Sequence, residues 1–338
     1  MIRRHRLWLA IALLAAFVLG GVALFDHGSR VAMRTAIGVK HPLLFTVPAG
    51  ADLGQVAARL ASAGLVSQRA YFEWRVRWAG VAGALQAGTY EVLPTDTPST
   101  LLEKMLKGQT KTFAITFVEG TRFIELRRVL DAHPYVVHSL AGQSDDQVMA
   151  ALGRAGEAAE GWFFPSTYHF KAETSDLALL KRAHQRMRKE LDTAWQGRAE
   201  SVPYKTPYDA LIMASIVEKE TARADERPAI AGVFVRRLKN GMKLQTDPTV
   251  IYGMGDSYTG NIRRADLERD TPYNTYTRKG LPPTPIALPG AAALNAATSP
   301  AGGDALYFVA RGDGSHQFSA SLGEHDDAVR RFQLRGKR

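Results

Sequence analysis

Residues 206–221 read TPYDALIMASIVEKET, and the eight residues after Asp209 carry a single polar side chain, that of Ser215. Thr206 is a suitable N-cap, and Pro207 suits the first helical position. Asp209 places a negative charge in the first turn, where the helix dipole favours it. The pattern therefore predicts a helix. Because a helix that is apolar on every side is buried, we expect this one to form the centre of a folded domain.

A carboxylic acid follows this apolar run directly. Glu218 shares a helical face with Leu211, Ala214 and Ser215, at spacings of seven, four and three residues. Such a position removes the carboxyl group from water, and desolvation raises its pKa. A carboxyl group that keeps its proton near neutral pH can act as a general acid in glycosidic cleavage. Glu218 is therefore our candidate catalytic residue.

A structural role for Glu218 is the alternative. Lys219, Arg223 and Arg227 follow it closely, and an ion pair also perturbs a pKa. The residue types do not separate these two interpretations. Glu220 is the nearest rival as the acid, but two residues further along a helix its side chain points to a different face.

The N-terminus predicts a membrane anchor. The first six residues include three arginines, and residues 7–25 contain no charge. Nineteen residues at ~1.5 Å each nearly span a ~30 Å hydrocarbon core. The positive-inside rule makes residues 1–6 a cytoplasmic tail and 7–25 a single transmembrane helix in the inner membrane. The remainder would be periplasmic. A cleaved signal peptide, cut near residues 21–23, is the alternative, but its apolar part is usually only ~7–15 residues long.

The rest of the chain divides into a tether and two α+β parts. Residues 26–42 are expected to be a linker, 43–110 a small α+β module, and 111–338 a larger α+β domain. A strand–turn–helix pattern occurs in both parts. Gly50 and Gly120 are each followed by apolar residues three, six and ten positions later. The size of the module suits polymer binding, although a structural spacer would have the same composition.

Turn residues, amides and tyrosines are dense downstream of the apolar helix, which predicts long loops. Flat aromatic faces and amide donors suit sugar rings with their hydroxyl and acetamido groups. Long loops in a compact domain tend to be functional, although solvated surface loops are the simpler interpretation. The candidate substrate-binding residues are Gln245, Thr246, Asp247, Tyr252, Tyr273, Asn274, Tyr276, His316 and Glu324.

Other functional classes find less support. The net charge is +10 with a pI near 9.8, but the basic residues are scattered without aromatic interleaving, so we expect no nucleic-acid partner. The absence of cysteine excludes disulfides, thiolate zinc sites and cysteine nucleophiles. His316, Glu324 and His325 have loose spacing and no His-Glu-x-x-His helix, so we expect neither metal nor cofactor. The Gly-x-Ser-x-Gly motif of serine hydrolases does not occur.

Several longer motifs occur in order along the chain. They are EGWFFP at 160–165 with Thr167 and Tyr168, ASIVEKET at 214–221, LQTDPTVIYG at 244–253, PYNTY at 272–276, GLPPTPI at 280–286, and GDG at 312–314 with His316, Phe318 and Ser319. With these motifs the chain resembles the endolytic murein transglycosylase family, also called YceG-like, and the likeness covers nearly the whole chain, including the anchor. Thr246 stands where the family leads us to expect Ser, and Asp326 where we expect Asn, which affects the expected substrate contacts only.

The resemblance implies a LysM-like module before the catalytic domain and a catalytic glutamate at Glu218. The implied reaction is non-hydrolytic cleavage of the β-1,4 bond between N-acetylmuramic acid and N-acetylglucosamine. Glu218 would protonate the leaving oxygen and then accept the proton of the muramic acid C6 hydroxyl, closing a 1,6-anhydro ring. One carboxyl group then suffices, unlike the pair used by ordinary glycosidases. Asp247 would orient Glu218 or support developing charge.

The implied partners are peptidoglycan strands and, through the anchor, the membrane. An active site tethered there reaches glycan near the membrane, where new strands emerge, so internal cuts would limit strand length. Enzymes of peptidoglycan synthesis become candidate partners for the same reason. The rival functions are a non-catalytic peptidoglycan-binding protein and a hydrolase that uses water.

Overall fold

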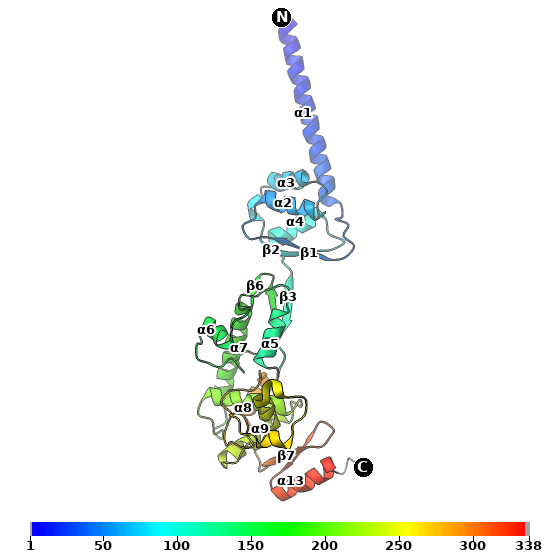
Figure 1. The fold of residues 1–338 in the computed structure, drawn as a ribbon. Coiled ribbons are helices and arrows are strands. Elements are labelled where there is room, and N and C mark those ends of the chain that lie inside the picture. Colours follow the sequence, from blue (N-terminus) through cyan, green and yellow to red (C-terminus); the bar gives the residue numbers. More distant parts are fainter. Residues whose placement is uncertain (1, 335–338) are drawn as a thin grey trace. The chain divides into compact units, whose positions relative to one another are not determined.

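The computed structural model describes residues 2–334, with side chains from residue 5 onward (Figure 1). The start of the predicted cytoplasmic tail and the last four residues of the predicted catalytic domain lie outside this range. The chain forms two compact units. The first runs to Phe113 and includes the short piece Phe170–Ala172, and the second contains the rest from Ala114 onward.

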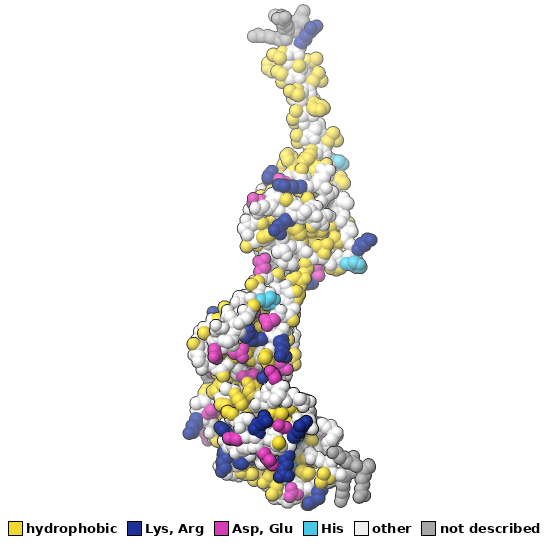
Figure 2. Space-filling model, in the orientation of Figure 1, with side chains coloured by type: hydrophobic (Ala, Val, Ile, Leu, Met, Phe, Trp, Pro, Cys, Tyr) yellow, Lys and Arg dark blue, Asp and Glu magenta, His cyan; other side chains and the backbone are white. Residues whose placement is uncertain are grey.

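The first unit begins with the long helix α1 (Ile2–Arg34), which contains the whole predicted transmembrane segment 7–25. It is the one helix among the described residues that is long and apolar enough to cross a membrane. Its apolar side chains are exposed, as Figure 2 shows by the hydrophobic atoms along this helix, and Phe17 is 80% exposed. Such a surface is unfavourable in water and suited to lipid.

The predicted linker 26–42 is wrong in its first half, because α1 continues to Arg34. The helix persists there because the module covers one side of it. Asp26 accepts hydrogen bonds from Trp74 (3.4 Å) and Arg75 (3.1 Å), and Met33 is buried in the core of the module. Composition alone predicts a linker at 26–42. Composition does not reveal that one face of this segment packs against the module as a helix.

The module after α1 is small and built around a two-stranded sheet. Its buried side chains include Val56, Leu60, Phe72, Val76 and Tyr90, each at most 1% exposed. Strand β1 pairs antiparallel with β2, and the chain order between them is strand, helix, helix, strand. The elements are β1 (Leu43–Val47), α2 (Leu53–Ser62), α3 (Arg69–Trp78), the 3-10 turn Ala82–Ala84, β2 (Gly88–Val92) and α4 (Pro98–Lys107).

The repeated strand–turn–helix pattern is confirmed. Gly50 and Gly120 have φ values of +74° and +73°, a left-handed conformation that favours glycine. Three residues later the helices α2 and α5 (Phe123–Asp131) begin. In both helices the three apolar positions predicted from the spacing are buried.

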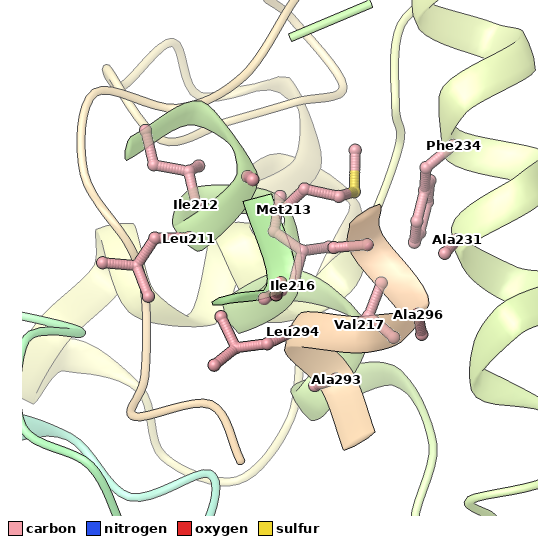
Figure 3. Close-up of a cluster of buried hydrophobic side chains, with 14 of the residues drawn as sticks. Leu211, Ile212, Met213, Ile216, Val217, Ala231, Phe234, Ala293, Leu294 and Ala296 are labelled. Carbon is pink, nitrogen blue, oxygen red and sulfur yellow. The ribbon is translucent and has the colours of Figure 1, made fainter. Parts of the chain in front are cut away.

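Helix α8 (Pro207–Glu220) forms the centre of the second unit, as the sequence predicts. The Thr206 hydroxyl accepts a bond from the Asp209 N–H, and the Asp209 carboxylate accepts one from the Thr206 N–H, which closes a capping box. Every residue from 210 to 217 is buried. Figure 3 shows Leu211, Ile216 and Val217 of α8 lying among side chains of α9 (Arg227–Lys239) and α12 (Ala291–Thr298).

Alanines on α12 and Gly232 on α9 allow this close packing. Ala293, Ala296 and Ala297 are at most 2% exposed. A Cβ at Gly232 would lie 2.4 Å from the Ala301 carbonyl oxygen. The backbone at Ala301, just after α12, can therefore approach α9 closely only because position 232 carries no side chain.

The other elements of this unit are short, apart from α7. The long loops expected downstream of α8 are interrupted by a helix, because Asp247–Met254 forms α10, with Pro248 in its first turn, where its missing N–H has no cost. Strand β3 pairs with β5, β4 with β6, and β7 with β8. The elements are β3 (Thr112–Thr116), β4 (Val136–Val137), α6 (Asp145–Ala151), β5 (Thr167–Lys171), β6 (Thr174–Ser175), α7 (Asp176–Gln196), α11 (Arg264–Glu268), β7 (Tyr307–Ala310), β8 (His316–Ser319), α13 (Leu322–Val329), the 3-10 turn Gly255–Ser257 and the π-helical turn Arg330–Leu334.

Truncation of a core isoleucine tests the central role of α8. Ile216 is fully buried, whereas Ile124 on α5 is 42% exposed. Ile216→Ala is expected to lower the free energy of unfolding by about 2–5 kcal/mol, because it removes buried methyl groups and leaves a cavity. The matched Ile124→Ala change is expected to cost less than about 1 kcal/mol. Urea unfolding measures both, and equal losses would contradict a core centred on α8.

Candidate active site

The carboxyl group of Glu218 lies at the end of α8, in contact with two other segments. Its side chain is only 4% exposed. Arg227 Nη2 donates to Glu218 Oε1 at 2.8 Å, and the Gly290 N–H donates to Oε2 at 2.9 Å. Gly290 is the N-cap of α12, so the positive end of that helix dipole also faces the carboxylate.

Opposing effects act on the pKa of Glu218. Burial raises this pKa above its ordinary value. The Gly290 N–H and the Arg227 guanidinium partly oppose the rise, whereas the carboxylate of Glu119 adds to it. The expectation of a raised pKa agrees with this environment. The ion pair of the structural alternative, with Arg227, is present as well.

A cavity of about 540 Å³ distinguishes this pair from an ordinary buried ion pair. Glu218, Arg227 and Glu119 line it, together with the turn at Gly120. Lys219 Nζ donates to the Gly120 carbonyl oxygen at 3.1 Å. The second copy of the repeated strand–turn–helix pattern therefore forms one wall of this cavity.

Glu119 packs closely against the backbone of Gly290. A Cβ at this position would lie 2.0 Å from Glu119 Oε1. A side chain at position 290 would therefore displace the Glu119 carboxylate from its present place beside Gly290. Glu119 Oε2 also lies 4.0 Å from Arg227 Nη2, and its side chain is half exposed. One guanidinium thus lies near two carboxylates.

Glu220 points away from Glu218 but lines the same cavity, as its position on the helix predicts. The Thr246 hydroxyl donates to its carboxyl group. Burial raises the pKa of Glu220 to about 7, and the nearby Asp247 carboxylate contributes to the rise. Two glutamates with desolvated carboxyl groups therefore line one cavity, and of these two only Glu218 has a direct cationic partner.

A second cavity, of about 580 Å³, brings together four of the predicted substrate-binding residues: Gln245, Asp247, Tyr276 and His316. Glu220 lines this cavity too, so it borders both. The four predicted residues come from three segments that are distant in the sequence: Gln245 and Asp247 at the start of α10, Tyr276 in a loop, and His316 in β8.

Asp247 does not contact Glu218, contrary to its expected orienting role. Asp247 Oδ1 accepts a hydrogen bond from the Tyr276 hydroxyl at 2.5 Å. Its charge acts on Glu220 instead. The side chain of His316 is likewise held by a partner, because its Nδ1 lies 2.6 Å from Glu226 Oε2.

The rings of Tyr252 and Tyr273 are in contact in a tilted arrangement, with ring centroids 4.8 Å apart and an interplanar angle of 59°. Tyr252 lines a smaller cavity of about 220 Å³ that shares Lys219 with the Glu218 cavity. The Tyr252 hydroxyl donates to Glu160 at 3.2 Å, and the Tyr273 hydroxyl pairs with that of Thr284 at 2.9 Å. Both hydroxyls thus have protein partners.

Asn274 and Glu324 both form hydrogen bonds with backbone groups in this structure, and their contact with substrate stays a prediction. The Asn274 amide is 1% exposed and donates to backbone carbonyls, including that of Arg269 at 2.6 Å. Glu324 accepts a bond from the Ser321 N–H at 3.3 Å in the capping box of α13. Amide and carboxylate groups that suit a sugar also suit unpaired backbone groups.

Sequence reasoning missed Glu160, although it belongs to the EGWFFP motif. Its carboxylate accepts bonds from the Phe123 N–H (2.9 Å) and the Tyr252 hydroxyl, joining α5 to α10. Burial raises its pKa to about 7, against the lowering effect of these bonds. A single Glu in a loop carries no periodic signal, so only the motif drew attention to it.

Comparisons with known proteins identify the family. The profile of the YceG-like family matches residues 45–331, which is most of the chain. The protein belongs to the YceG-like family. It is 28% identical to the endolytic murein transglycosylase of Bacillus subtilis (strain 168) over 332 residues, covering 93% of this chain and 91% of that protein.

Two further relatives agree with this assignment. The endolytic murein transglycosylase of Streptococcus pneumoniae (strain D39) is 26% identical over 84% of this chain, and the match spans 57% of that longer protein. A crystal structure of a YceG-like protein from Listeria monocytogenes has 28% identity and a TM-score of 0.54, covering 86% of this chain and 99% of that one. The YceG-like fold is thus shared.

Replacement of Glu160 tests its raised pKa. Between pH 4.5 and about 7 the folded protein keeps a proton that the unfolded chain has lost. The stability of the wild type should therefore fall as pH rises through this window, with about 3 kcal/mol due to this group. Glu160→Gln cannot ionise, so its unfolding free energy should fall less between pH 4.5 and 7.5 in urea titrations. Glu268→Gln, at an exposed site, should match the wild type.

Proposed function

We propose that this protein is an endolytic peptidoglycan transglycosylase anchored in the inner membrane. Its substrate would be the nascent glycan strand, cut at the β-1,4 bond between N-acetylmuramic acid and N-acetylglucosamine. The observation that carries this proposal is the nearly inaccessible carboxyl group of Glu218 at the wall of a cavity. The names of the relatives add support for the reaction class.

Glu218 would act first as an acid and then as a base. In the first step its proton moves to the glycosidic oxygen, and the bond from muramic acid C1 to that oxygen breaks. In the second, the C6 hydroxyl oxygen bonds to C1 and its proton returns to Glu218. The product carries a 1,6-anhydro ring, and no water is consumed. Such proton transfer typically contributes about 10²–10⁴-fold to a rate.

The surroundings of Glu218 suit both protonation states. Burial favours the neutral acid before cleavage, whereas Arg227 and the Gly290 N–H stabilise the carboxylate afterwards. The half-exposed Glu119 places a second negative charge at the same cavity, where positive charge develops on the sugar ring. A balance of this kind lowers the free-energy difference between the acid and base forms.

The remaining parts would bring the substrate to this carboxyl group. The module at 43–110 would bind glycan in a LysM-like manner. Of the predicted contacts, Gln245, Tyr276 and His316 would bind sugar in the second cavity. Thr246 and Asp247 would set the protonation state of Glu220 beside that cavity. Tyr252 would offer an aromatic surface near Lys219, with the ring of Tyr273 against it.

Substitution of the two glutamates tests the mechanism. Glu218→Gln is expected to lower the release of fragments from purified sacculi by about 10²–10⁴-fold, because the amide cannot deliver a proton. Glu220→Gln should lose much less, since the amide can still accept the bond from Thr246. Chromatography with mass spectrometry measures the products. Equal release by wild type and Glu218→Gln would leave a binding protein as the better description.

The chemistry of the new ends separates the transglycosylase from a hydrolase. Products of the proposed reaction should end in 1,6-anhydro-muramic acid, which has one water less in mass than a reducing end. Mass spectrometry of fragments from a single digestion measures the ratio of the two kinds of end. A predominance of reducing ends would mean that water, and not the C6 hydroxyl, attacks C1.

Labelling tests the proposed topology, because the natural chain contains no cysteine. Gln109→Cys lies on the exposed surface of the module, and His5→Cys lies before the apolar run. In intact spheroplasts a membrane-impermeant maleimide should label position 109 and leave position 5 unlabelled until the membrane is opened. Labelling of position 5 in intact cells would contradict a cytoplasmic N-terminus.

A further inference from the structure

Helix α3 packs against α1 at the point where the apolar run of α1 ends. The ring of Phe25 lies 4.9 Å from that of Tyr71 and 5.7 Å from that of Trp74. One turn further, Gly28 gives room for the Tyr71 hydroxyl, which would lie 2.9 Å from a Cβ at that position. The contacts of Phe25 and Gly28, on either side of Asp26, thus fix the position of α3 along the axis of α1.

This position along α1 coincides with the headgroup layer of a bilayer that residues 7–25 cross. The polar layer on each side of the hydrocarbon core is about 5–8 Å thick. A helix with its side chains is about 10 Å wide. A helix that touches Phe25 and Gly28 therefore lies within or directly against that layer.

The outer face of α3 has the composition expected at such a position. Its inner face is formed by Phe72 and Val76, which are buried in the module. On the outer face, Ala70 is exposed, the Arg77 side chain is 67% exposed and Trp78 is 70% exposed. Tryptophan is enriched at membrane interfaces, where its ring contacts acyl chains and its N–H contacts headgroups.

The charges around this face are unbalanced. Four arginines share two carboxylates: Asp26 pairs with Arg30 and Arg75, and Glu73 pairs with Arg69 and Arg77. The cluster therefore has a net positive charge, and anionic lipid headgroups attract such clusters. Figure 2 shows Lys and Arg side chains beside hydrophobic ones at the end of the module from which α1 emerges.

We propose that the outer face of α3 docks on the membrane surface, with Trp78 and the arginine cluster in contact with anionic phospholipid headgroups. This inference rests on the proposed membrane anchor and is independent of the reaction at Glu218. Docking would hold the module against the bilayer, so that glycan bound to it would lie next to the membrane.

A fluorescent label on α3 tests this docking. The probe is attached at Ala70→Cys in the full chain, reconstituted in nanodiscs that contain phosphatidylglycerol and a lipid with a nitroxide-labelled headgroup. We expect strong loss of fluorescence at this position. Gln109→Cys is the control, because the N–H of Lys111, two residues later, donates to the Thr89 carbonyl oxygen of β2, and β2 lies at the other end of the module from α3 (Figure 1). Equal, weak quenching at both positions would overturn the proposal.

Two variants in the Ala70→Cys background identify the chemistry. Arg77→Gln should lower the ratio of docked to undocked module about five-fold in phosphatidylglycerol discs, the effect of one cationic side chain at an anionic surface. Trp78→Ser should also reduce quenching. Unchanged quenching in both variants would overturn the proposed contacts. A change in the fluorescence of the label on addition of soluble glycan strands, with no quenching by the nitroxide lipid, would overturn them as well. Failure of the chain to enter nanodiscs would refute the anchor itself.

Discussion

Enclosure of α8 is the constraint on which the second unit depends. No face of this helix can remain in water, since residues 210–217 are all buried and Ser215 uses its hydroxyl to bond the backbone at Ile212 and Ile286. Burial of each large apolar side chain contributes about 1.5–3 kcal/mol, so the surrounding helices gain by covering all sides. The end of the helix then reaches the protein surface at a fixed point, and Glu218 is held there.

The same enclosure gives the two glutamates at this end different environments. Glu218 faces the N-terminus of α12 and the guanidinium of Arg227, whereas Glu220 faces Thr246 and the carboxylate of Asp247. Because the two glutamates are two residues apart on the helix, their side chains point in different directions and contact different partners around one cavity. Both carboxyl groups are desolvated, but only Glu218 has a guanidinium and a backbone N–H as direct partners, whereas Glu220 has the hydroxyl of Thr246. This asymmetry is the physical basis for our proposal that Glu218 transfers the proton.

The first unit depends on a different interaction, the packing of α1 on the module. An exposed apolar helix gives no information about the segment after it, but the contacts of Phe25, Asp26 and Met33 make the helix continuous with a folded core. A module attached in this way has a defined level relative to any bilayer that α1 crosses. A flexible linker would have left that level undetermined.

Elements with local signals could be established from the amino-acid sequence alone. The apolar run 7–25, the capped helix α8, the two glycine turns and the burial of Glu218 follow from period, caps and composition, and the motifs gave the family. The partners of the polar side chains became clear only in the folded chain. Asn274 and Glu324 satisfy backbone groups, Asp247 acts on Glu220, and Glu160 joins α5 to α10. These outcomes depend on which segments meet in space, and side-chain chemistry is the same whether its partner is a sugar or a backbone carbonyl.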